Sequence, residues 1–313
     1  MFLLNQDIFL WDLMILMLMS VFLALSIGCL ILRHRLLSFL SFLSFFLVVY
    51  ASFIEPQIIT VTKKTLSHPL APTVRIAIVS DYHVGPYKGA RFVERSVKKI
   101  NALLPDIVLL PGDFVFTHSA TAEDLDPLQN LHPSIGVYAV LGNHDVGEYQ
   151  SLSGVRYSGV SRGEAIANKL EELGIHVLRN AHDIVTTSDG QIAIAGVDDI
   201  WTGHDNLPAA LTDIPLSAFT ILLSHNPSII DDPLSHDAHL IVSGHTHGGQ
   251  MRLPGLGPIP SLPTSLGRQY DQGLFDVDAD TTLAITRGIG ESSPRTRLLA
   301  WPEILLIDLT GTR

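Results

Sequence analysis

Two uncharged apolar runs near the N-terminus constrain the fold of this chain more than any other feature. Residues 13–32 form an uncharged run of 20 residues and residues 36–54 form a second of 19, separated by Arg33-His34-Arg35. A helix of this length can cross about 30 Å of hydrocarbon. We therefore expect residues 1–54 to be a membrane anchor of two hydrophobic helices, which would hold the protein in the cell membrane through residues 13–54.

Two other arrangements of this segment fit the same pattern. One helix can span the bilayer while the other lies in its interface, or the segment can be a signal peptide cleaved after "VYA" at residues 49–51. Positive charge near a membrane tends to stay in the cytoplasm, and Arg33 with Arg35 is the basic cluster between the two runs. Two spans would then place the large C-terminal part outside the cytoplasm, although Lys63 and Lys64 argue for the opposite orientation.

The charge of the remaining chain argues against nucleic acid as a partner. Residues 1–70 carry three acidic and four basic side chains, which leaves 28 acidic and 16 basic ones, a net charge of −12, on the remainder. A surface that binds a phosphate backbone needs the opposite sign. The single cysteine, Cys29, lies in the first apolar run, so the chain offers neither an internal disulfide nor a thiolate metal site.

Residues 55–72 are polar and contain prolines, and we expect them to link the anchor to a separate domain over residues 73–313. That domain contains short runs rich in Val, Ile and Ala, which are typical of buried strands in a sheet covered on both faces. Helical spacing of apolar residues between the runs, over 91–104 and 163–173, favours a layered α/β or α+β fold. The runs are "VRIAIVS" (74–80), "DIVLLPGD" (106–113), "GVYAVLGN" (136–143), "QIAIAGVDD" (191–199), "AFTILLSH" (218–225) and "AHLIVSGH" (238–245).

Five of these six runs end in, or lead directly into, the side chains that we expect to bind metal, whereas Asp198 and Asp199 at the end of the sixth fit a supporting role or a plain turn equally well. Ligand sites in open sheets form at the carboxyl ends of strands, so we expect these side chains to converge. Seven donors are too many for one ion but suit two ions that share a bridging carboxylate, and mixed imidazole and carboxylate ligands favour Mn, Fe or Zn. Two such ions, about 3.5–4 Å apart, can clamp both oxygens of a phosphoryl transfer. The donors are Asp81, His83, Asp113, Asn143, His225, His245 and His247.

In order, these motifs resemble those of the calcineurin-like metallophosphoesterases. The matching pieces are D-x-H from Asp81, G-D ending at Asp113, G-N-H-D from Gly142, S-H ending at His225, and G-H-T-H-G-G-Q from Gly244. Weaker pieces, such as "TRGIG" (286–290) and "WPEILLI" (301–307), are similar to the membrane-linked bacterial branch of YkuE/YaeI-like phosphoesterases. The resemblance covers roughly residues 73–310 and implies a two-sheet β-sandwich flanked by helices.

The resemblance also implies a role for each matched residue. Asp81, His83 and His247 would bind the first ion, Asn143, His225 and His245 the second, and Asp113 would bridge them. His144 would face the scissile phosphate and assist the leaving oxygen, with Asp145 orienting its imidazole. We expect Arg295 and Arg297 to be surface residues, although either guanidinium can pair with a phosphate.

The implied function is hydrolysis of a phosphate monoester, a phosphate diester or a pyrophosphate by attack of a metal-bridging hydroxide. Membrane attachment favours a lipid-linked substrate, because a tethered site meets bilayer substrates at high effective concentration. Two alternatives are a UDP-lipid-sugar pyrophosphatase of cell-envelope lipid synthesis, which needs a cytoplasmic active site, and a metal-binding membrane scaffold without turnover. The sequence does not identify the oligomeric state.

Overall fold

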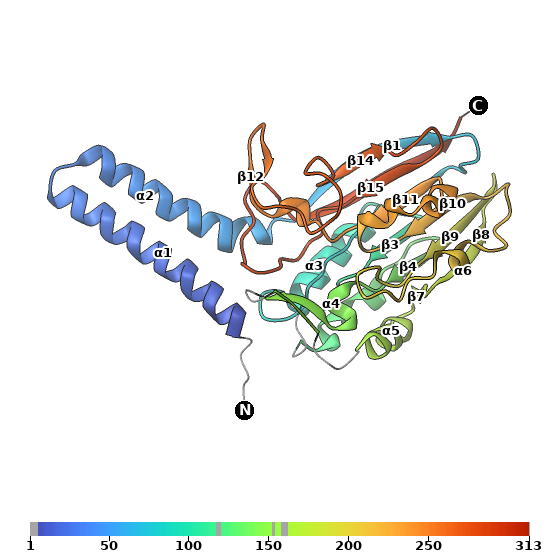
Figure 1. The fold of residues 1–313 in the computed structure, drawn as a ribbon, viewed down its shortest axis with the longest axis horizontal. Coiled ribbons are helices and arrows are strands. Elements are labelled where there is room, and N and C mark those ends of the chain that lie inside the picture. Colours follow the sequence, from blue (N-terminus) through green and yellow to red (C-terminus); the bar gives the residue numbers. More distant parts are fainter. Residues whose placement is uncertain (1–5, 117–119, 152–153, 158–161, 313) are drawn as a thin grey trace.

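Two six-stranded sheets packed face to face form the body of the protein, and a long helical hairpin projects from one end of it (Figure 1). The computed structural model describes residues 6–116, 120–151, 154–157 and 162–312. Helices cover the outer faces of both sheets. The expected α/β fold with a two-sheet sandwich is therefore confirmed.

The first sheet has the strand order β1-β16-β2-β3-β4-β7 and is parallel except where β16 meets β2. Its strands are Thr60–His68 (β1), Glu303–Gly311 (β16), Val74–Ile78 (β2), Ile107–Pro111 (β3), Gly136–Val140 (β4) and His176–Val177 (β7). The second sheet has the order β14-β15-β11-β10-β9-β8, with antiparallel strands at both edges. Its strands are Gly273–Asp276 (β14), Thr282–Ile285 (β15), Leu240–Ser243 (β11), Phe219–Leu223 (β10), Gln191–Gly196 (β9) and Ala181–Thr186 (β8).

All six apolar runs expected to be strands form strands, namely β2, β3, β4, β9, β10 and β11. Two small antiparallel pairs lie outside the main sheets: Glu148–Ser151 (β5) with Gly154–Tyr157 (β6), and Arg252–Leu253 (β12) with Gly257–Pro258 (β13). The helices of the body are Ala90–Asn101 (α3), Ala122–Asn130 (η3), Asn143–Val146 (α4), Gly163–Glu172 (α5), Leu207–Leu211 (α6), Pro227–Asp231 (η4), Pro233–Asp237 (η5) and His247–Gly249 (η6).

The central strands, such as β3, β10 and β11, are buried on both faces because each sheet is covered on both. Residues such as Ile76 and Leu109 of the first sheet pack between the sheets against Ile221 and Val242 of the second. The outer face of the first sheet packs against α3, η3 and α5, and that of the second against α6 and η4. This four-layer arrangement fixes the strand ends in one rigid frame.

Helix α3 illustrates how local sequence sets an element's limits. Phe92, Val93, Val97 and Ile100 are spaced to lie on one side of a helix, and all four are buried. The expected helix extended to residue 104, but α3 ends at Asn101 and Leu104 is exposed. The reason is local, because Leu104 precedes a proline, and a residue in that position is sterically disfavoured in the helical conformation.

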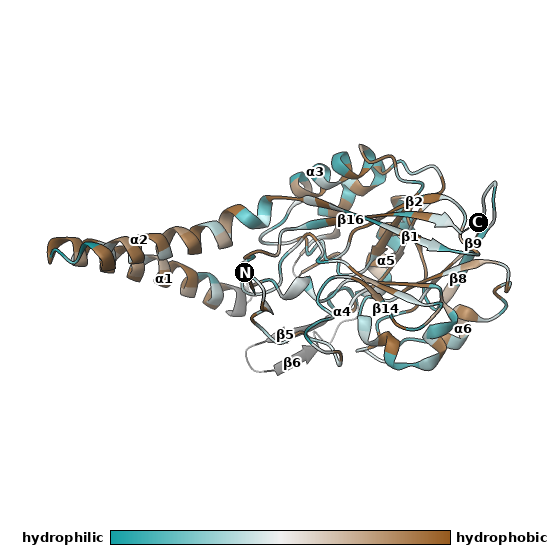
Figure 2. Cartoon of the chain, turned by 90° about the horizontal axis from the view of Figure 1, so that it is seen from above, coloured by the Kyte–Doolittle hydropathy of each residue, from teal (hydrophilic) through white to brown (hydrophobic). Residues whose placement is uncertain are grey.

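The two N-terminal apolar runs form antiparallel helices, Gln6–Ile31 (α1) and Arg35–Val49 (α2), joined by a turn in which Arg33 has a φ of 63°. Ser26 and Ser38 connect the helices by exchanging hydroxyl-to-carbonyl hydrogen bonds of 3.0 and 2.8 Å. Phe9–Ile31 and Arg35–Gln57 are long and apolar enough to cross a membrane. Only 11% and 17% of their most apolar windows are buried, unlike the core helix of a soluble protein. Figure 2 shows the hydrophobic colour along most of both helices.

The hairpin meets the body through the π-helical and 3-10 turns Tyr50–Ile54 (η1) and Glu55–Gln57 (η2). The buried Glu55 carboxylate accepts a hydrogen bond of 2.8 Å from the Ala300 amide, and Trp301 Nε1 donates to Tyr50 Oη at 3.2 Å. On α1, Asp12 accepts a hydrogen bond of 3.1 Å from the Tyr87 hydroxyl. The hairpin is therefore joined to the body at both of its helices.

Part of the stretch expected to be a linker is instead a strand of the first sheet. β1 pairs in parallel with β16 along its whole length, from Thr60–Glu303 to His68–Gly311. Its sequence TVTKKTLSH combines β-branched residues with exposed lysines, a composition suited to the edge of a sheet. The polar side chains that suggested a linker are those of an edge strand, so a domain starting at residue 73 would lack this strand.

Candidate metal centre

The seven predicted donors meet at one end of the sandwich, in the loops that follow five strands. Asp81 and His83 follow β2, Asp113 follows β3, Asn143 begins α4 after β4, His225 follows β10, and His245 and His247 follow β11. Each is less than 7% exposed. Charged and polar groups at this burial need partners or a metal ion, because an isolated charge is costly to bury.

Asp81, His83 and His247 form a first cluster of donor atoms. The Nε2 atoms of the two histidines are 3.2 Å apart, and Asp81 Oδ1 lies 3.4 Å from His247 Nε2 and 3.9 Å from His83 Nε2. Two atoms bound about 2.1 Å from one ion, at angles of about 90–109°, lie about 3.0–3.4 Å apart. Two of these three spacings thus already match those of ligands on a shared ion.

Asp113, His225 and His245 form a second cluster beside the first. His225 Nε2 lies 3.1 Å from both Asp113 Oδ2 and His245 Nδ1. Asn143 is buried directly after Gly142, at the first position of α4. The second cluster therefore has the same donor spacing and the same mixture of imidazole and carboxylate groups.

One oxygen of Asp113 lies between the clusters. Its Oδ2 is 3.4 Å from His83 Nε2 in the first cluster and 3.1 Å from His225 Nε2 in the second. Its Oδ1 instead accepts a hydrogen bond of 3.0 Å from the backbone amide of His144. This division of roles leaves a single oxygen that faces both groups of imidazoles.

Backbone carbonyls fix the orientation of two of the rings. His225 Nδ1 is 2.7 Å from the carbonyl oxygen of Pro111, and His245 Nε2 is 2.9 Å from that of Pro263. A carbonyl accepts only from N–H, so these nitrogens carry a proton and the other nitrogen of each ring points into the site. Carbonyl partners of this kind commonly orient histidine ligands of metal ions.

The electrostatic environment keeps most of the imidazoles neutral. Burial lowers the pKa of His83 and His247 well below the usual value and that of His245 to about 3. Burial also opposes charge on His225, but the Asp113 carboxylate outweighs it and raises the pKa of His225 to about 10. Burial raises the pKa of Asp113, yet the imidazoles of His225 and His144 hold it well below its usual range. The Asp113 carboxylate is thus paired with the second proton of His225, at Nε2, 3.1 Å away.

Five of the seven donors have left-handed backbone conformations, which side-chain-bearing residues seldom adopt. Their φ angles are 52° for Asp81, 45° for His83, 57° for Asp113, 67° for His245 and 52° for His247. Asn, Asp and His tolerate this region better than most residues. The sharp turns aim consecutive donors inward at the strand ends.

Glycines allow the loops to approach the donors closely. A Cβ at Gly142 would lie 2.2 Å from Asp113 Oδ1, and one at Gly244 would lie 2.5 Å from Asp81 Oδ2. After His247, Gly248 and Gly249 turn the chain with φ angles of 60° and 75°. These contacts explain why glycine occupies these positions in the G-N-H-D and G-H-T-H-G-G motifs.

His144 is half-buried beside His83 and Asp113, but Asp145 does not orient it. His144 Nδ1 is 2.8 Å from the carbonyl oxygen of Phe116, which orients the ring and leaves Nε2 available. The Asp145 carboxylate instead accepts hydrogen bonds of 2.8, 3.1 and 2.9 Å from the amides of Phe114, Val115 and Gly142. The expected Asp145–His144 contact was wrong because the carboxylate caps the short helix α4 and joins it to the loop after β3.

Arg297 also differs from its expected place at the surface. It is fully buried, and its guanidinium donates to the carbonyl oxygens of Ala300 at 2.7 Å, Arg287 at 2.9 Å and Gly290 at 3.0 Å. Burial lowers its pKa to about 10, which still leaves it charged at neutral pH. Arg295 is half-buried and stacks on the rings of Phe53 and Tyr87. No sequence pattern distinguished these arginines, because their acceptors are backbone carbonyls.

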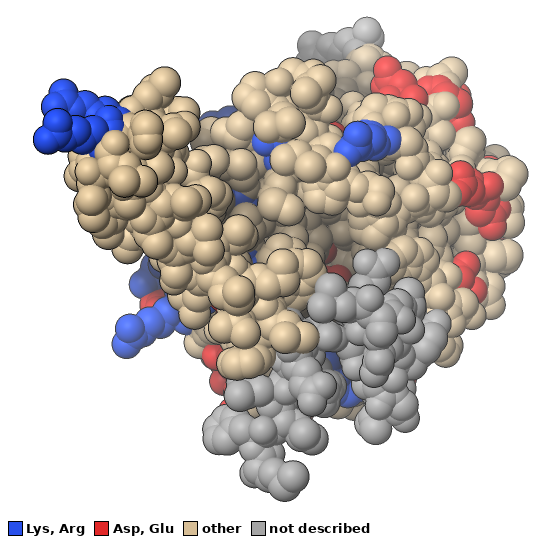
Figure 3. Space-filling view, turned by 60° about the vertical axis from the view of Figure 1, so that its left-hand side comes forward, with Lys and Arg blue, Asp and Glu red and all other residues tan. Residues whose placement is uncertain are grey.

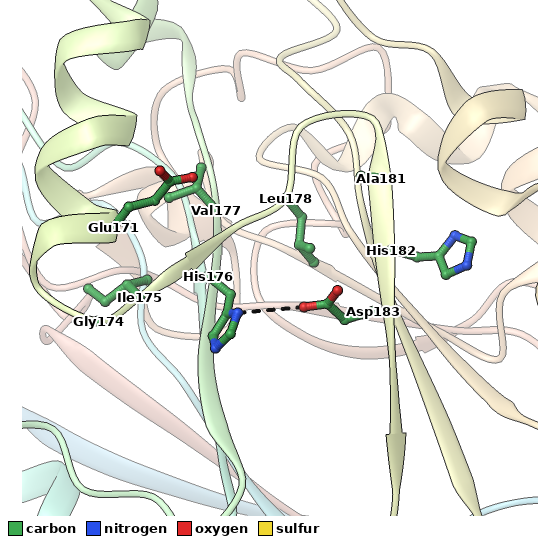
Figure 4. A pocket seen from close by; sticks show the side chains of 9 residues that line it. All are labelled: Glu171, Gly174, Ile175, His176, Val177, Leu178, Ala181, His182 and Asp183. Carbon is green, nitrogen blue, oxygen red and sulfur yellow. Dashed lines mark ion pairs between the residues drawn. The ribbon is translucent and has the colours of Figure 1, made fainter.

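A cavity of about 440 Å³ lies at another part of the body and is separate from the donors (Figure 4). It lies beside α5, β7 and β8 and is lined by Glu171 and residues 174–178 and 181–183. A weak ion pair of 3.6 Å between His176 and Asp183 crosses it. None of the seven donors lines this cavity.

Comparisons with known proteins agree with this geometry. Residues 74–249 match the family model described as calcineurin-like phosphoesterase. The chain is 30% identical to the uncharacterized metallophosphoesterase YkuE of Bacillus subtilis, over 84% of this chain and 90% of that protein. It is 29% identical to phosphodiesterase YaeI of Escherichia coli, over 76% of this chain and 83% of that protein. It is 28% identical to UDP-2,3-diacylglucosamine pyrophosphatase LpxG of Chlamydia trachomatis, over 83% of this chain and 92% of that protein.

The family model covers more than half of the chain, and its span includes all seven donors. The relatives include proteins named for phosphodiesterase and pyrophosphatase activity. The chain therefore belongs to the calcineurin-like phosphoesterases, a family of hydrolases that depend on two metal ions.

Proposed function

We propose that this protein is a membrane-anchored phosphoesterase that uses two metal ions to hydrolyse a phosphate monoester, a phosphate diester or a pyrophosphate. The observation that carries the proposal is the position of Asp113 Oδ2, which faces an imidazole of each cluster at 3.4 and 3.1 Å. A single oxygen between two groups of ligands is what a pair of adjacent ions requires.

In this proposal Asp81, His83 and His247 hold one ion, and Asn143, His225 and His245 hold the other, with Asp113 shared. The chemistry that such ions supply when bound is polarisation of the phosphoryl oxygens and activation of water as a nucleophile. The mixture of carboxylate, amide and imidazole donors fits Mn, Fe or Zn. The histidines contribute neutral nitrogen donors, and the buried loops keep them in place for catalysis.

His144 supplies the general acid. Its Nδ1–H donates to the Phe116 carbonyl at 2.8 Å, so its Nε2 is the nitrogen that can exchange a proton with the substrate. Its ring centroid is 4.7 Å from that of His83, which places it against the first cluster. Protonation of the leaving oxygen by a side chain in such a position contributes about 10²–10⁴-fold to the rate.

The test is to measure metal content and hydrolysis of an aryl phosphate monoester and an aryl phosphate diester by the purified full chain. We expect two metal ions per chain, and we expect His144→Ala to keep both ions but to lose about 10²–10⁴-fold in turnover. His132→Ala is the matched control, because His132 is exposed. A fully active His144→Ala protein would refute the assigned role. A parent protein that holds metal but shows no turnover would favour the scaffold, and one that holds no metal would refute both.

The membrane part of the proposal rests on the hairpin. Residues 13–54 would cross the membrane twice, with the turn at Arg33 and Arg35 in the cytoplasm and the catalytic body outside. A reporter fused to the C-terminus, one active only in the cytoplasm or only outside it, distinguishes the two orientations. Activity of the cytoplasmic reporter would reverse the orientation proposed here.

The likeness to LpxG supports a second candidate, hydrolysis of the pyrophosphate in a nucleotide-linked acylated sugar. This candidate requires a cytoplasmic body and therefore the opposite orientation. It is tested by comparing turnover of UDP-diacylglucosamine with that of a lipid phosphodiester in the same mixed micelles. Preference for the nucleotide substrate, together with a cytoplasmic reporter result, would replace the first candidate.

A further inference from the structure

An exposed apolar flap lies between the metal centre and the base of the hairpin. The flap comprises residues 251–260, in which β12 and β13 pair with Arg252 opposite Pro258. Leu253, Leu256 and Ile259 are 45%, 78% and 49% exposed. The chain carries no charged residue from 253 to 267. Large apolar side chains that are exposed together on a short loop mark an interaction surface, whereas single ones are ordinary.

The chain segment of the flap connects directly to the metal centre. It begins four residues after His247, and η6 and Gln250 occupy the space between them. On its far side, Pro263 supplies the carbonyl that orients His245 at 2.9 Å. A Cβ at Gly249 would lie 2.2 Å from Pro258 Cβ, so the flap packs closely on the turn after His247. The position of the flap is therefore coupled to that of two candidate ligands.

The flap is also connected to the base of the hairpin. Met251 bridges Leu298, and the Arg252 amide donates to the Leu298 carbonyl at 2.9 Å. Two residues later, the Ala300 amide donates to Glu55, and Trp301 donates to Tyr50. The intervening segment has exposed apolar side chains too, with Leu299 39% and Trp301 38% exposed. Figure 1 shows the β12 loop beside the end of the second hairpin helix.

The base of the hairpin marks where a bilayer would end. The uncharged runs begin after Asp12 and end before Glu55, and these two carboxylates are held by the body through Tyr87 and Ala300. A membrane that surrounds the runs would therefore reach the body at the level of Tyr50 and Glu55. In Figure 3 the surface to the right of the hairpin is mostly uncharged, charged side chains lie below the hairpin, and most acidic side chains lie along the right-hand edge.

We propose that the 251–260 flap inserts its leucine and isoleucine side chains into the head-group boundary of the membrane, so that the metal centre faces the lipid surface. This inference rests on one part of the proposed function, namely that the hairpin crosses the bilayer. The lipid surface is the favoured occupant, because the apolar surface continues from the flap to the membrane helices through Leu299 and Trp301.

Two features of the flap suit a shallow insertion. Prolines have no N–H group, so each one removes a donor that would otherwise need a partner away from water. The flap and the segment after it contain four, Pro254, Pro258, Pro260 and Pro263. The one charged residue within the flap, Arg252, pairs with Asp271 and donates to the Gly248 carbonyl at 3.0 Å, so it is held on the protein side.

The test places an environment-sensitive fluorophore on the flap of the full chain in phospholipid vesicles. Cys29 is the only cysteine, so Cys29→Ser gives a background for Leu256→Cys. Leu216→Cys is the matched control, because Leu216 is 98% exposed and precedes β10, at the strand end opposite the metal centre. We expect a blue shift at position 256, with quenching by lipids that carry a nitroxide on the acyl chain, and neither effect at position 216.

Equal responses at the two positions would overturn the proposal. A blue shift at position 256 that depends on the protein-to-lipid ratio and is not quenched by the nitroxide lipids would also overturn the proposal. That result would mean that a second copy of the chain covers the flap.

A second measurement links the flap to turnover. Leu256→Asp should lower hydrolysis of a phosphodiester lipid in vesicles while hydrolysis of a soluble aryl phosphate stays unchanged, and Leu216→Asp should change neither. Loss of both activities in Leu256→Asp, or of neither, would contradict a role for the flap at the lipid surface. If the parent hydrolyses no aryl phosphate, the proposed function fails, whereas the fluorescence result still decides whether the flap meets lipid.

Discussion

Gly142 has no room for a side chain, and its replacement by alanine tests whether the placement of the Asp113 carboxylate matters. A Cβ at this position would lie 2.2 Å from Asp113 Oδ1 and 2.7 Å from the Asp113 amide nitrogen. Its φ of −104° is accessible to alanine, so backbone strain does not contribute. The substitution therefore acts through contact with Asp113, the carboxylate proposed to be shared by the two ions.

The size of the effect follows from that distance. Side-chain contacts essentially never fall below 3.0 Å, so the carboxylate or the loop must move by at least 0.8 Å. A misplacement of about 1 Å in a catalytic group costs about 10²-fold in rate, or about 2.7 kcal/mol of transition-state stabilisation. Overpacking of this kind also lowers the free energy of unfolding by about 1–3 kcal/mol.

The assay is kcat/KM on an aryl phosphate together with metal content, measured well below the unfolding temperature. We expect Gly142→Ala to lose about 10²-fold in kcat/KM and to bind metal more weakly. Gly190→Ala serves as the control, because the nearest atom to its Cβ is a proline carbon 3.6 Å away. If Gly142→Ala keeps both ions and full activity, the position of the Asp113 carboxylate does not limit catalysis, and the reasoning from the bridging oxygen fails.

Three further predictions concern the proton on His225, the cap of α4 and the core. The pKa of His225 is raised to about 10, so below that pH a metal ion must displace its proton. The apparent affinity of metal-free protein for the metal ion, measured by titration, should therefore rise by up to about tenfold per pH unit between pH 6 and 8. A flat profile would show that no such proton is displaced. Asp145→Asn replaces a carboxylate that accepts three amide hydrogen bonds, and should lower the free energy of unfolding by about 1–3 kcal/mol in denaturant titrations. An unchanged denaturant midpoint would contradict the role of Asp145 as the cap of α4. Leu110→Ala, at a fully buried position, should cost about 2–5 kcal/mol, and Leu216→Ala, at a 98% exposed one, should stay within about 0.5 kcal/mol; similar losses at both sites would count against the described core.

The strands and donors were predictable from sequence because both signals are local. A run such as "DIVLLPGD" carries its strand and its donor, Asp113, within eight residues. Once the runs are parallel strands of packed sheets, their polar ends must meet at one edge. The motif order then identified the family, and the structure brings six of the seven donors into two compact clusters.

The remaining features depend on contacts between distant parts of the chain. β1 pairs with β16, more than 230 residues away, and its lysines suggested a linker until that partner was visible. The Phe116 carbonyl that orients His144 and the carbonyls that surround Arg297 are backbone atoms, which no side-chain pattern reveals. Asp145 was expected to bond to the His144 ring because the two residues are adjacent in sequence. Its partners are instead backbone amides, which no side-chain pattern reveals.

The left-handed backbone at five candidate ligands restricts how this centre can change during evolution. A position with a φ near 50–60° tolerates Asp, Asn, His or Gly but penalises most other residues, whatever their affinity for metal. Replacement of one of these ligands by alanine therefore changes the loop as well as the donor, whereas exchange among Asp, Asn and His changes mainly the donor. We expect related proteins to vary their metal preference through such exchanges, because these are the substitutions that leave the turns at the strand ends intact.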